Sequence, residues 1–81
     1  MLYFAWVKEK VGISTETVTP PADVGTVADL MTWLAARGAG HAAAFAQRGL
    51  IKAAVDQVHV SHTAKLGGAR EVAFFPPVTG G

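Results

Sequence analysis

The 81-residue sequence has a formal net charge of +1, 51% hydrophobic residues, 16% charged residues and no cysteine. This length allows one domain with a modest core, and the scattered lysines and arginines provide no basic footprint for nucleic acid. Without cysteine there is no disulfide, thiol nucleophile or thiolate metal site, which suits a protein of the reducing cytoplasm, where we expect this one to act.

Two strands are predicted at the N-terminal end of the chain. Residues 2–7 form an apolar run rich in aromatic and β-branched types, typical of a strand buried on both faces. The run has no basic leader and is far too short to span a bilayer, so we interpret it as a strand and not as a signal peptide. After Gly12, residues 14–19 alternate polar and apolar positions, which predicts a half-exposed partner strand that ends at Pro20 and Pro21.

The next signal is a helix over residues 26–37. Thr26 followed by Asp29 resembles a capping box, in which hydroxyl and carboxylate accept hydrogen bonds from free backbone N–H groups. Gly38 supplies a C-terminal stop, and an alanine-rich segment at 41–47 predicts a short second helix. The main helix carries an apolar stripe that we expect to pack on a sheet. The stripe consists of Val27, Leu30, Met31 and Leu34.

Three more strands are predicted in the second half of the chain. Residues 50–55 and 58–60 form two short strands around Asp56-Gln57, although no glycine marks a tight turn there. Gly67-Gly68 forms a turn before a last strand at 71–75, whose alternation places Phe74 and Phe75 on opposite faces. One phenylalanine is then core and the other is a candidate exposed anchor. This order of elements predicts an α+β fold, a mixed sheet of about five strands packed against one main helix.

The end of the sequence is stiff, apolar and then free of side chains. Pro76 and Pro77 fix φ and lack N–H donors, so the strand must end near Phe75. Residues 76–81 can span roughly 20 Å if extended, and Gly80-Gly81, without Cβ atoms, fit a channel too narrow for side chains. We therefore divide the chain into a domain over 1–75 and an extended, flexible tail over 76–81 that is presented to a partner.

The sequence contains few side chains in patterns typical of catalysis or metal binding. His59 and His62 have no carboxylate at ligand spacing and nothing local that orients their rings, so we interpret them as edge-strand or turn residues; no role is assigned to His41. The serines lack a nucleophile-elbow context and the glycine pairs lack a phosphate-loop pattern. We expect no metal site, no bound cofactor and no catalytic side chain, which leaves the carboxylate of Gly81 as the reactive group.

These motifs resemble the MoaD family of small, sulfur-carrying subunits of molybdopterin synthase, which have a ubiquitin-like β-grasp fold. The similarity is strongest over 71–81 and is supported by residues 2–5, 26–30 and 53–57. One departure is Asp56, where the family commonly has asparagine.

The resemblance implies a non-catalytic carrier with three protein partners. An ATP-dependent, E1-like enzyme would adenylate the Gly81 carboxylate, which is anionic and a poor electrophile at neutral pH, and a sulfur donor protein would convert it to a thiocarboxylate. The tail would then enter the large catalytic subunit and donate sulfur to the cyclic pyranopterin precursor of the molybdenum cofactor. Phe74 or Phe75 would anchor the docking surface. The inserted tail residues would be Pro76, Pro77, Val78, Thr79 and Gly80.

Other functions remain open at this point. A sulfur carrier for thiamin or tRNA thiolation would share the diglycine, although the Phe-Phe-Pro-Pro segment favours molybdopterin synthase. A ubiquitin-like protein modifier would join Gly81 to a lysine of its target. A small interaction module would make no chemical use of the tail.

Overall fold

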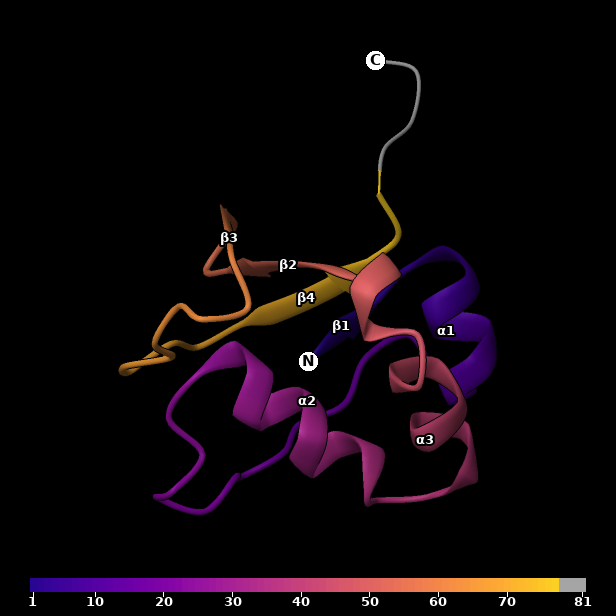
Figure 1. The fold of residues 1–81 in the computed structure, drawn as a ribbon, viewed down its shortest axis with the longest axis horizontal. Helices are drawn as coiled ribbons and strands as arrows, with labels where there is room; N and C mark the ends of the chain where they lie inside the picture. The colour runs from indigo at the N-terminus through magenta and orange to yellow at the C-terminus, as the bar shows by residue number, and fades with distance from the viewer. Residues whose placement is uncertain (78–81) are drawn as a thin grey trace.

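A four-stranded mixed sheet organises the fold, which the computed structural model describes for residues 1–77 (Figure 1). Its strands are β1 (Leu2–Tyr3), β2 (Lys52–Val55), β3 (Val58–Val60) and β4 (Val72–Phe75), in the order β1-β4-β2-β3. Strand β4 is parallel to β1, and β2 is antiparallel to both of its neighbours. The described residues therefore form an α+β fold, as predicted, but the sheet has four strands where about five were expected.

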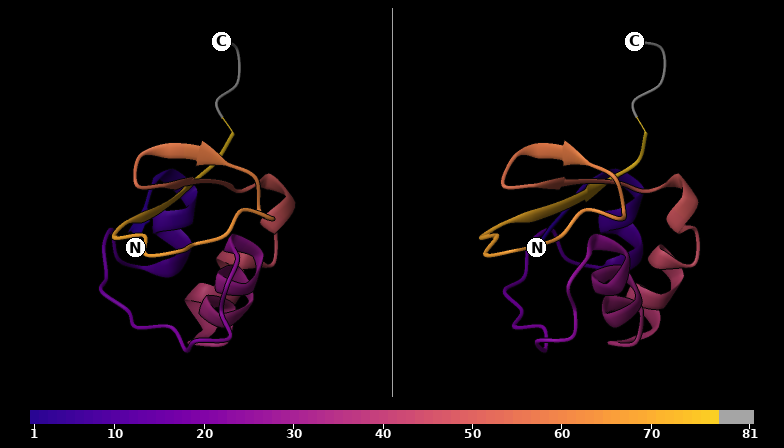
Figure 2. Two further views of the ribbon diagram at one scale, coloured as in Figure 1. Left: turned by 90° about the vertical axis from the view of Figure 1, so that its left-hand side faces the viewer. Right: turned by 60° about the vertical axis from the view of Figure 1, so that its left-hand side comes forward.

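Three helices accompany the sheet, one more than the main helix over 26–37 and the short second helix at 41–47 that were predicted. They are α1 (Ala5–Val11), α2 (Val27–Ala35) and α3 (Ala39–Phe45), and a single 3-10 turn at Arg48–Leu50 leads into β2. Helices α2 and α3 lie under one face of the sheet, and α1 packs beside α3 (Figures 1 and 2). No helix in the described part of the chain has both the length and the apolar character needed to span a bilayer.

The core fills the space between the sheet and the helices. The predicted stripe of α2 is completely buried, with Val27, Leu30, Met31 and Leu34 all 0% exposed. From the sheet, Tyr3 and Phe74 enter this core with their rings stacked at 6.2 Å between centroids. The Phe45 ring of α3 meets the Phe74 ring edge-on at 5.1 Å, a favoured aromatic geometry. One core therefore joins all three helices to the inner face of the sheet.

Helix α2 begins where the sequence predicted it to begin. The Thr26 hydroxyl accepts a hydrogen bond from the Asp29 N–H, and the Asp29 carboxylate accepts one from the Thr26 N–H, which completes the capping box. The first two N–H groups of the helix donate to carbonyls of the loop before β4, Val27 to Ala64 and Ala28 to His62. That loop is thereby fixed to the helix end.

The prediction of a strand over residues 2–7 is wrong after Tyr3. Ala5 adopts φ 52°, which turns the chain out of the sheet and into α1. Val7 is fully buried and Val11 is partly buried, at a helical spacing of four, with exposed Lys8, Glu9 and Lys10 between them. This helical period was present in the sequence, but the apolar run that precedes it resembles a strand.

The predicted strand over 14–19 is reduced to one antiparallel bridge between Leu2 and Thr15. The Tyr3 N–H donates to the Ser14 carbonyl at 2.9 Å, and the Glu16 N–H donates to the Met1 carbonyl at 3.0 Å. Because β1 has only two residues, it offers no more edge on which a longer strand could pair.

The hairpin formed by β2 and β3 confirms the predicted strand at 58–60, and the one predicted at 50–55 begins only at Lys52 because Leu50 ends the 3-10 turn. Its turn contains no glycine, yet Asp56 and Gln57 adopt φ 47° and 72°, the positive values that a tight primed turn requires. The Asp56 carboxylate accepts hydrogen bonds of 2.9 Å from the N–H groups of both Arg70 and Glu71. The turn therefore also holds the entry to β4.

Candidate functional site

The predicted tail directly follows β4, an interior strand of the sheet. Strand β4 pairs with β1 on one side and β2 on the other, and Phe75 is its last paired residue. Pro76 and Pro77 follow outside the strand, as their missing N–H groups require. The tail residues Val78, Thr79, Gly80 and Gly81, including the predicted reactive group, lie outside the described residues. The division into a domain over 1–75 and a tail over 76–81 remains a prediction.

The two phenylalanines proposed as alternative anchors occupy different environments. The Phe74 side chain is 0% exposed inside the aromatic cluster, so a partner cannot touch it while the domain is folded. Phe75 points to the opposite face and is half-buried, with its ring centroid 5.1 Å from that of His59. Of the two candidates, Phe75 is therefore the one that offers surface to a partner.

Other side chains surround the point where the chain leaves the sheet. Phe4, one residue beyond the Tyr3–Phe74 pair, is 49% exposed on an extended backbone. On the other side of Phe75 lies an open hollow of about 460 Å³. Its lining consists of Lys52, His59, Val60, Ser61, Phe75 and Pro77. We call Phe4, Lys52, His59, Phe75 and Pro77 together the tail-root surface.

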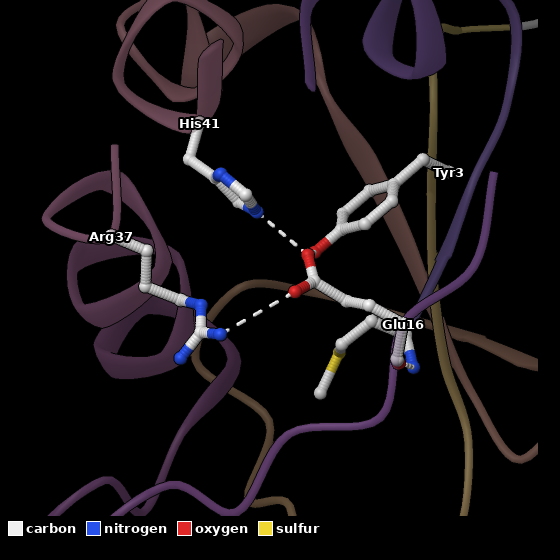
Figure 3. A network of polar contacts seen from close by, with 5 residues as sticks. Tyr3, Glu16, Arg37 and His41 are labelled. Carbon is white, nitrogen blue, oxygen red and sulfur yellow. Dashed lines mark hydrogen bonds and ion pairs between the residues drawn. The ribbon is translucent and has the colours of Figure 1, made fainter. Parts of the chain in front are cut away.

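A polar network that the sequence did not reveal lies on the other side of the sheet (Figure 3). Glu16 Oε2 accepts a hydrogen bond of 2.7 Å from the Tyr3 hydroxyl and lies 2.6 Å from His41 Nε2. Glu16 Oε1 is 3.6 Å from the Arg37 guanidinium. The four residues come from β1, the segment after α1, the turn between α2 and α3, and the first turn of α3, so the network connects these parts of the fold.

Protonation in this network follows from its geometry. Partial burial disfavours the charged form of Glu16, but hydrogen bonds from His41 and Tyr3 and the charges of His41 and Arg37 outweigh it and lower the pKa of the carboxyl. Burial, together with the adjacent Glu16, raises the pKa of the Tyr3 hydroxyl. Tyr3 is thus a stable donor to an ionised carboxylate. Because the Glu16 carboxylate finds three side-chain partners inside the fold, we interpret the network as structural.

The remaining histidines have local roles. His62 lies in a turn, as predicted, and its Nε2 is 2.7 Å from the carbonyl of Ile51, to which it donates. His59 lies on β3, the edge strand of the sheet, also as predicted. Within residues 1–77, no three His, Asp or Glu side chains are grouped so that they could hold a metal ion.

Comparisons with known proteins cover the whole chain. The model of the ThiS family matches residues 1–81. The molybdopterin synthase sulfur carrier subunit of Escherichia coli (strain K12) is 44% identical over 81 residues, which are 100% of this chain and 96% of that protein. The resemblance stated from the sequence motifs is thereby confirmed. The full-length match and the level of identity show that the chain belongs to the ThiS family.

Proposed function

We propose that this chain is the sulfur-carrier subunit of a molybdopterin synthase and acts in molybdenum cofactor biosynthesis in the cytoplasm. The main structural support is the way the chain leaves the sheet after β4. This strand is paired on both sides and ends at Phe75, and Pro76 and Pro77 then lead the chain out of the sheet. The 44% identity with a sulfur carrier along the entire chain supports the same role. The mixed sheet over the α2 helix is consistent with the β-grasp fold.

The reactive group in this proposal is the carboxylate of Gly81. As an anion it resists nucleophilic attack, so an E1-like enzyme first joins it to the adenylyl group of ATP and releases pyrophosphate. The terminal sulfur of a persulfide on a donor protein then attacks the acyl carbon and displaces AMP, which forms an acyl disulfide between the two proteins. A thiol then cleaves the S–S bond, becomes part of a disulfide with the donor cysteine, and leaves the thiocarboxylate on Gly81. ATP is therefore a substrate of the activating enzyme, and this chain binds no cofactor of its own.

The folded domain provides the surface that the large catalytic subunit recognises and binds. Residues 76–81 enter that subunit, where its own side chains catalyse the transfer of sulfur to the cyclic pyranopterin precursor. Gly80 permits close approach because it has no Cβ, and Pro76 and Pro77 reduce the entropy lost when the tail becomes ordered. Phe75 supplies apolar surface at the docking site.

Intact-mass measurement of the protein isolated from its own cells tests the proposal. We expect a fraction of the chain to carry one sulfur in place of one oxygen at Gly81, and a variant lacking Gly81 to carry none. Isopeptide conjugates to other proteins would instead identify a modifier. A thiocarboxylate that is consumed by a thiamin or tRNA thiolation system, and not by the large subunit, would identify a different carrier.

A further inference from the structure

Two cationic or hydrogen-bonding side chains lie beside the root of the tail. Lys52 of β2 stands directly opposite Phe75 of β4, and His59 of β3 stands opposite Ala54 of β2. Because Lys52 and Ala54 are two positions apart, Lys52 and His59 project from the same outer face of the sheet. Both line the hollow of about 460 Å³ next to Phe75 and Pro77.

Neither side chain has a polar partner within the described part of the chain. The ion pairs found there join Glu16 to Arg37 and His41, and no carboxylate among residues 1–77 lies within 4.0 Å of the Lys52 amino group. Glu71, which directly precedes β4, is four residues from Phe75, about 13 Å away at roughly 3.3 Å per residue. The His59 ring is packed against the Phe75 ring at 5.1 Å, which limits its orientation.

Lys52 and His59 lie so close to the tail that a protein which binds the tail also approaches these two side chains. The four residues after Pro77 span at most about 14 Å, so a protein that binds Gly81 in its active site must bring its surface to the tail root. When the large subunit covers this surface, Lys52 and His59 lose part of their hydration. An ammonium group that is desolvated without a counter-charge is strongly unfavourable, whereas a carboxylate can accept hydrogen bonds from both the ammonium and an imidazole N–H.

We infer that Lys52 and His59 form a receptor for an aspartate or glutamate side chain of the large synthase subunit, and that this contact selects that partner. The inference rests on the proposed function and adds the chemistry of recognition to it. Phe75 forms the apolar wall of the receptor, while Lys52 supplies the charge and His59 a directed donor. We assign the acid to the large subunit because, in the proposed function, the two proteins are subunits of one synthase.

Titration calorimetry of the full-length chain with the purified large subunit tests this contact. We expect Lys52→Glu to weaken the affinity by about tenfold or more at low salt, because it places like charges together. Lys65→Glu is the matched control, since Lys65 is an exposed lysine of the loop near α2 and lies outside the tail-root surface. It should bind within about twofold of the wild type, as expected for a surface charge remote from the interface. Circular dichroism confirms that both variants fold.

Carbodiimide crosslinking identifies the acid directly, because this reagent condenses a lysine amine with a carboxylate that touches it. A crosslink from Lys52 to an Asp or Glu of the large subunit supports the inference. Binding of Lys52→Glu within about twofold of the wild type would overturn it, as would a variant that binds normally but is adenylated slowly. If the wild-type chain neither binds nor transfers sulfur, the proposed function fails; if it does both and only the Lys52 effect is missing, the inference alone fails.

Discussion

Tyr3 and Glu16, thirteen residues apart, are joined by a hydrogen bond of 2.7 Å between the hydroxyl and Oε2. The same oxygen lies 2.6 Å from His41 Nε2, so one carboxylate connects the first strand to the start of α3. The Glu16 side chain is only 13% exposed, and Tyr3 also stacks on Phe74 of the strand that carries the tail. The network therefore supports the fold from which the tail emerges.

Replacing Glu16 by glutamine should destabilise the fold. The change keeps the shape of the side chain but removes the charge that strengthens the bonds from Tyr3 and His41, at an expected loss of about 2 kcal/mol in unfolding free energy. Urea unfolding at pH 7 measures it. Glu9→Gln, on the exposed side of α1, is the control and should change the unfolding free energy by less than about 0.5 kcal/mol.

The wild type and the Glu16→Gln variant should also differ in their pH dependence. The pKa of the Glu16 carboxyl is lowered in the folded state, so its contribution to stability is complete above the unfolded pKa of about 4.3 and is lost as the pH falls through the folded value. The stability difference between the two proteins should therefore shrink below about pH 4. A difference that stays constant from pH 7 to pH 3 would contradict the assigned ionisation.

Gly40 is required by the close approach of α3 to the end of α1. A Cβ at position 40 would lie 2.6 Å from the Lys10 carbonyl oxygen and 3.0 Å from that of Val11, and both are backbone atoms. Gly40→Ala should therefore lower the unfolding free energy by about 2 kcal/mol. Gly49→Ala is the control, because the Cβ that alanine adds at position 49 would meet nothing within 4 Å. Equal stability of the two variants would argue against this packing.

The turn between β2 and β3 offers a stabilising substitution. Gln57 adopts φ 72°, which is unfavourable for a residue with a Cβ. Gln57→Gly should raise the unfolding free energy by up to about 1 kcal/mol, because Asp-Gly is a preferred pair in such turns. Asp56→Ala should have the opposite effect, since the N–H groups of Arg70 and Glu71 lose their acceptor. Thermal unfolding measures both effects: the midpoint temperature should rise for Gln57→Gly and fall for Asp56→Ala.

Helix α2, the β2–β3 hairpin and β4 could be predicted because each depends on local signals. The capping box of Thr26, the spacing of Leu30 and the prolines after Phe75 are all read from neighbouring residues. The start of α1 could not be predicted in this way, because residues 2–7 are uniformly apolar and no local signal marks the positive φ at Ala5. The strand predicted over 14–19 was too long for the same reason, because it was expected to pair with a strand over 2–7 that ends at Tyr3.

The polar network and the tail-root surface depend on contacts between distant residues. Glu16 and His41 are separated by 25 residues, and no spacing rule connects them. Lys52 and His59 come next to Phe75 only through the β2–β3 and β2–β4 registers. Periodicity predicted that one of Phe74 and Phe75 is core, but only the fold shows which.

Replacing Phe75 by aspartate should weaken binding to the large subunit. The half-buried ring supplies apolar area at the root of the tail, and a carboxylate there would be desolvated on docking. We expect a loss of about 2 kcal/mol in binding free energy, measured by titration calorimetry. Affinity measured for Phe4→Asp, at the exposed phenylalanine of the tail-root surface, tests whether the interface extends to β1. Unchanged affinity of Phe75→Asp would exclude Phe75 as an anchor.

In the proposed function Gly81 carries the sulfur, and a single-turnover reaction with both subunits is the sharpest test of this role. The purified thiocarboxylate form is mixed with the large subunit and the cyclic pyranopterin precursor, and the mass of this chain is followed together with the product. We predict that the chain exchanges its sulfur for oxygen as molybdopterin appears, and that the folded variant lacking Gly81 yields no product. Product formation by that variant, or a thiocarboxylate that persists while product accumulates, would contradict the claim.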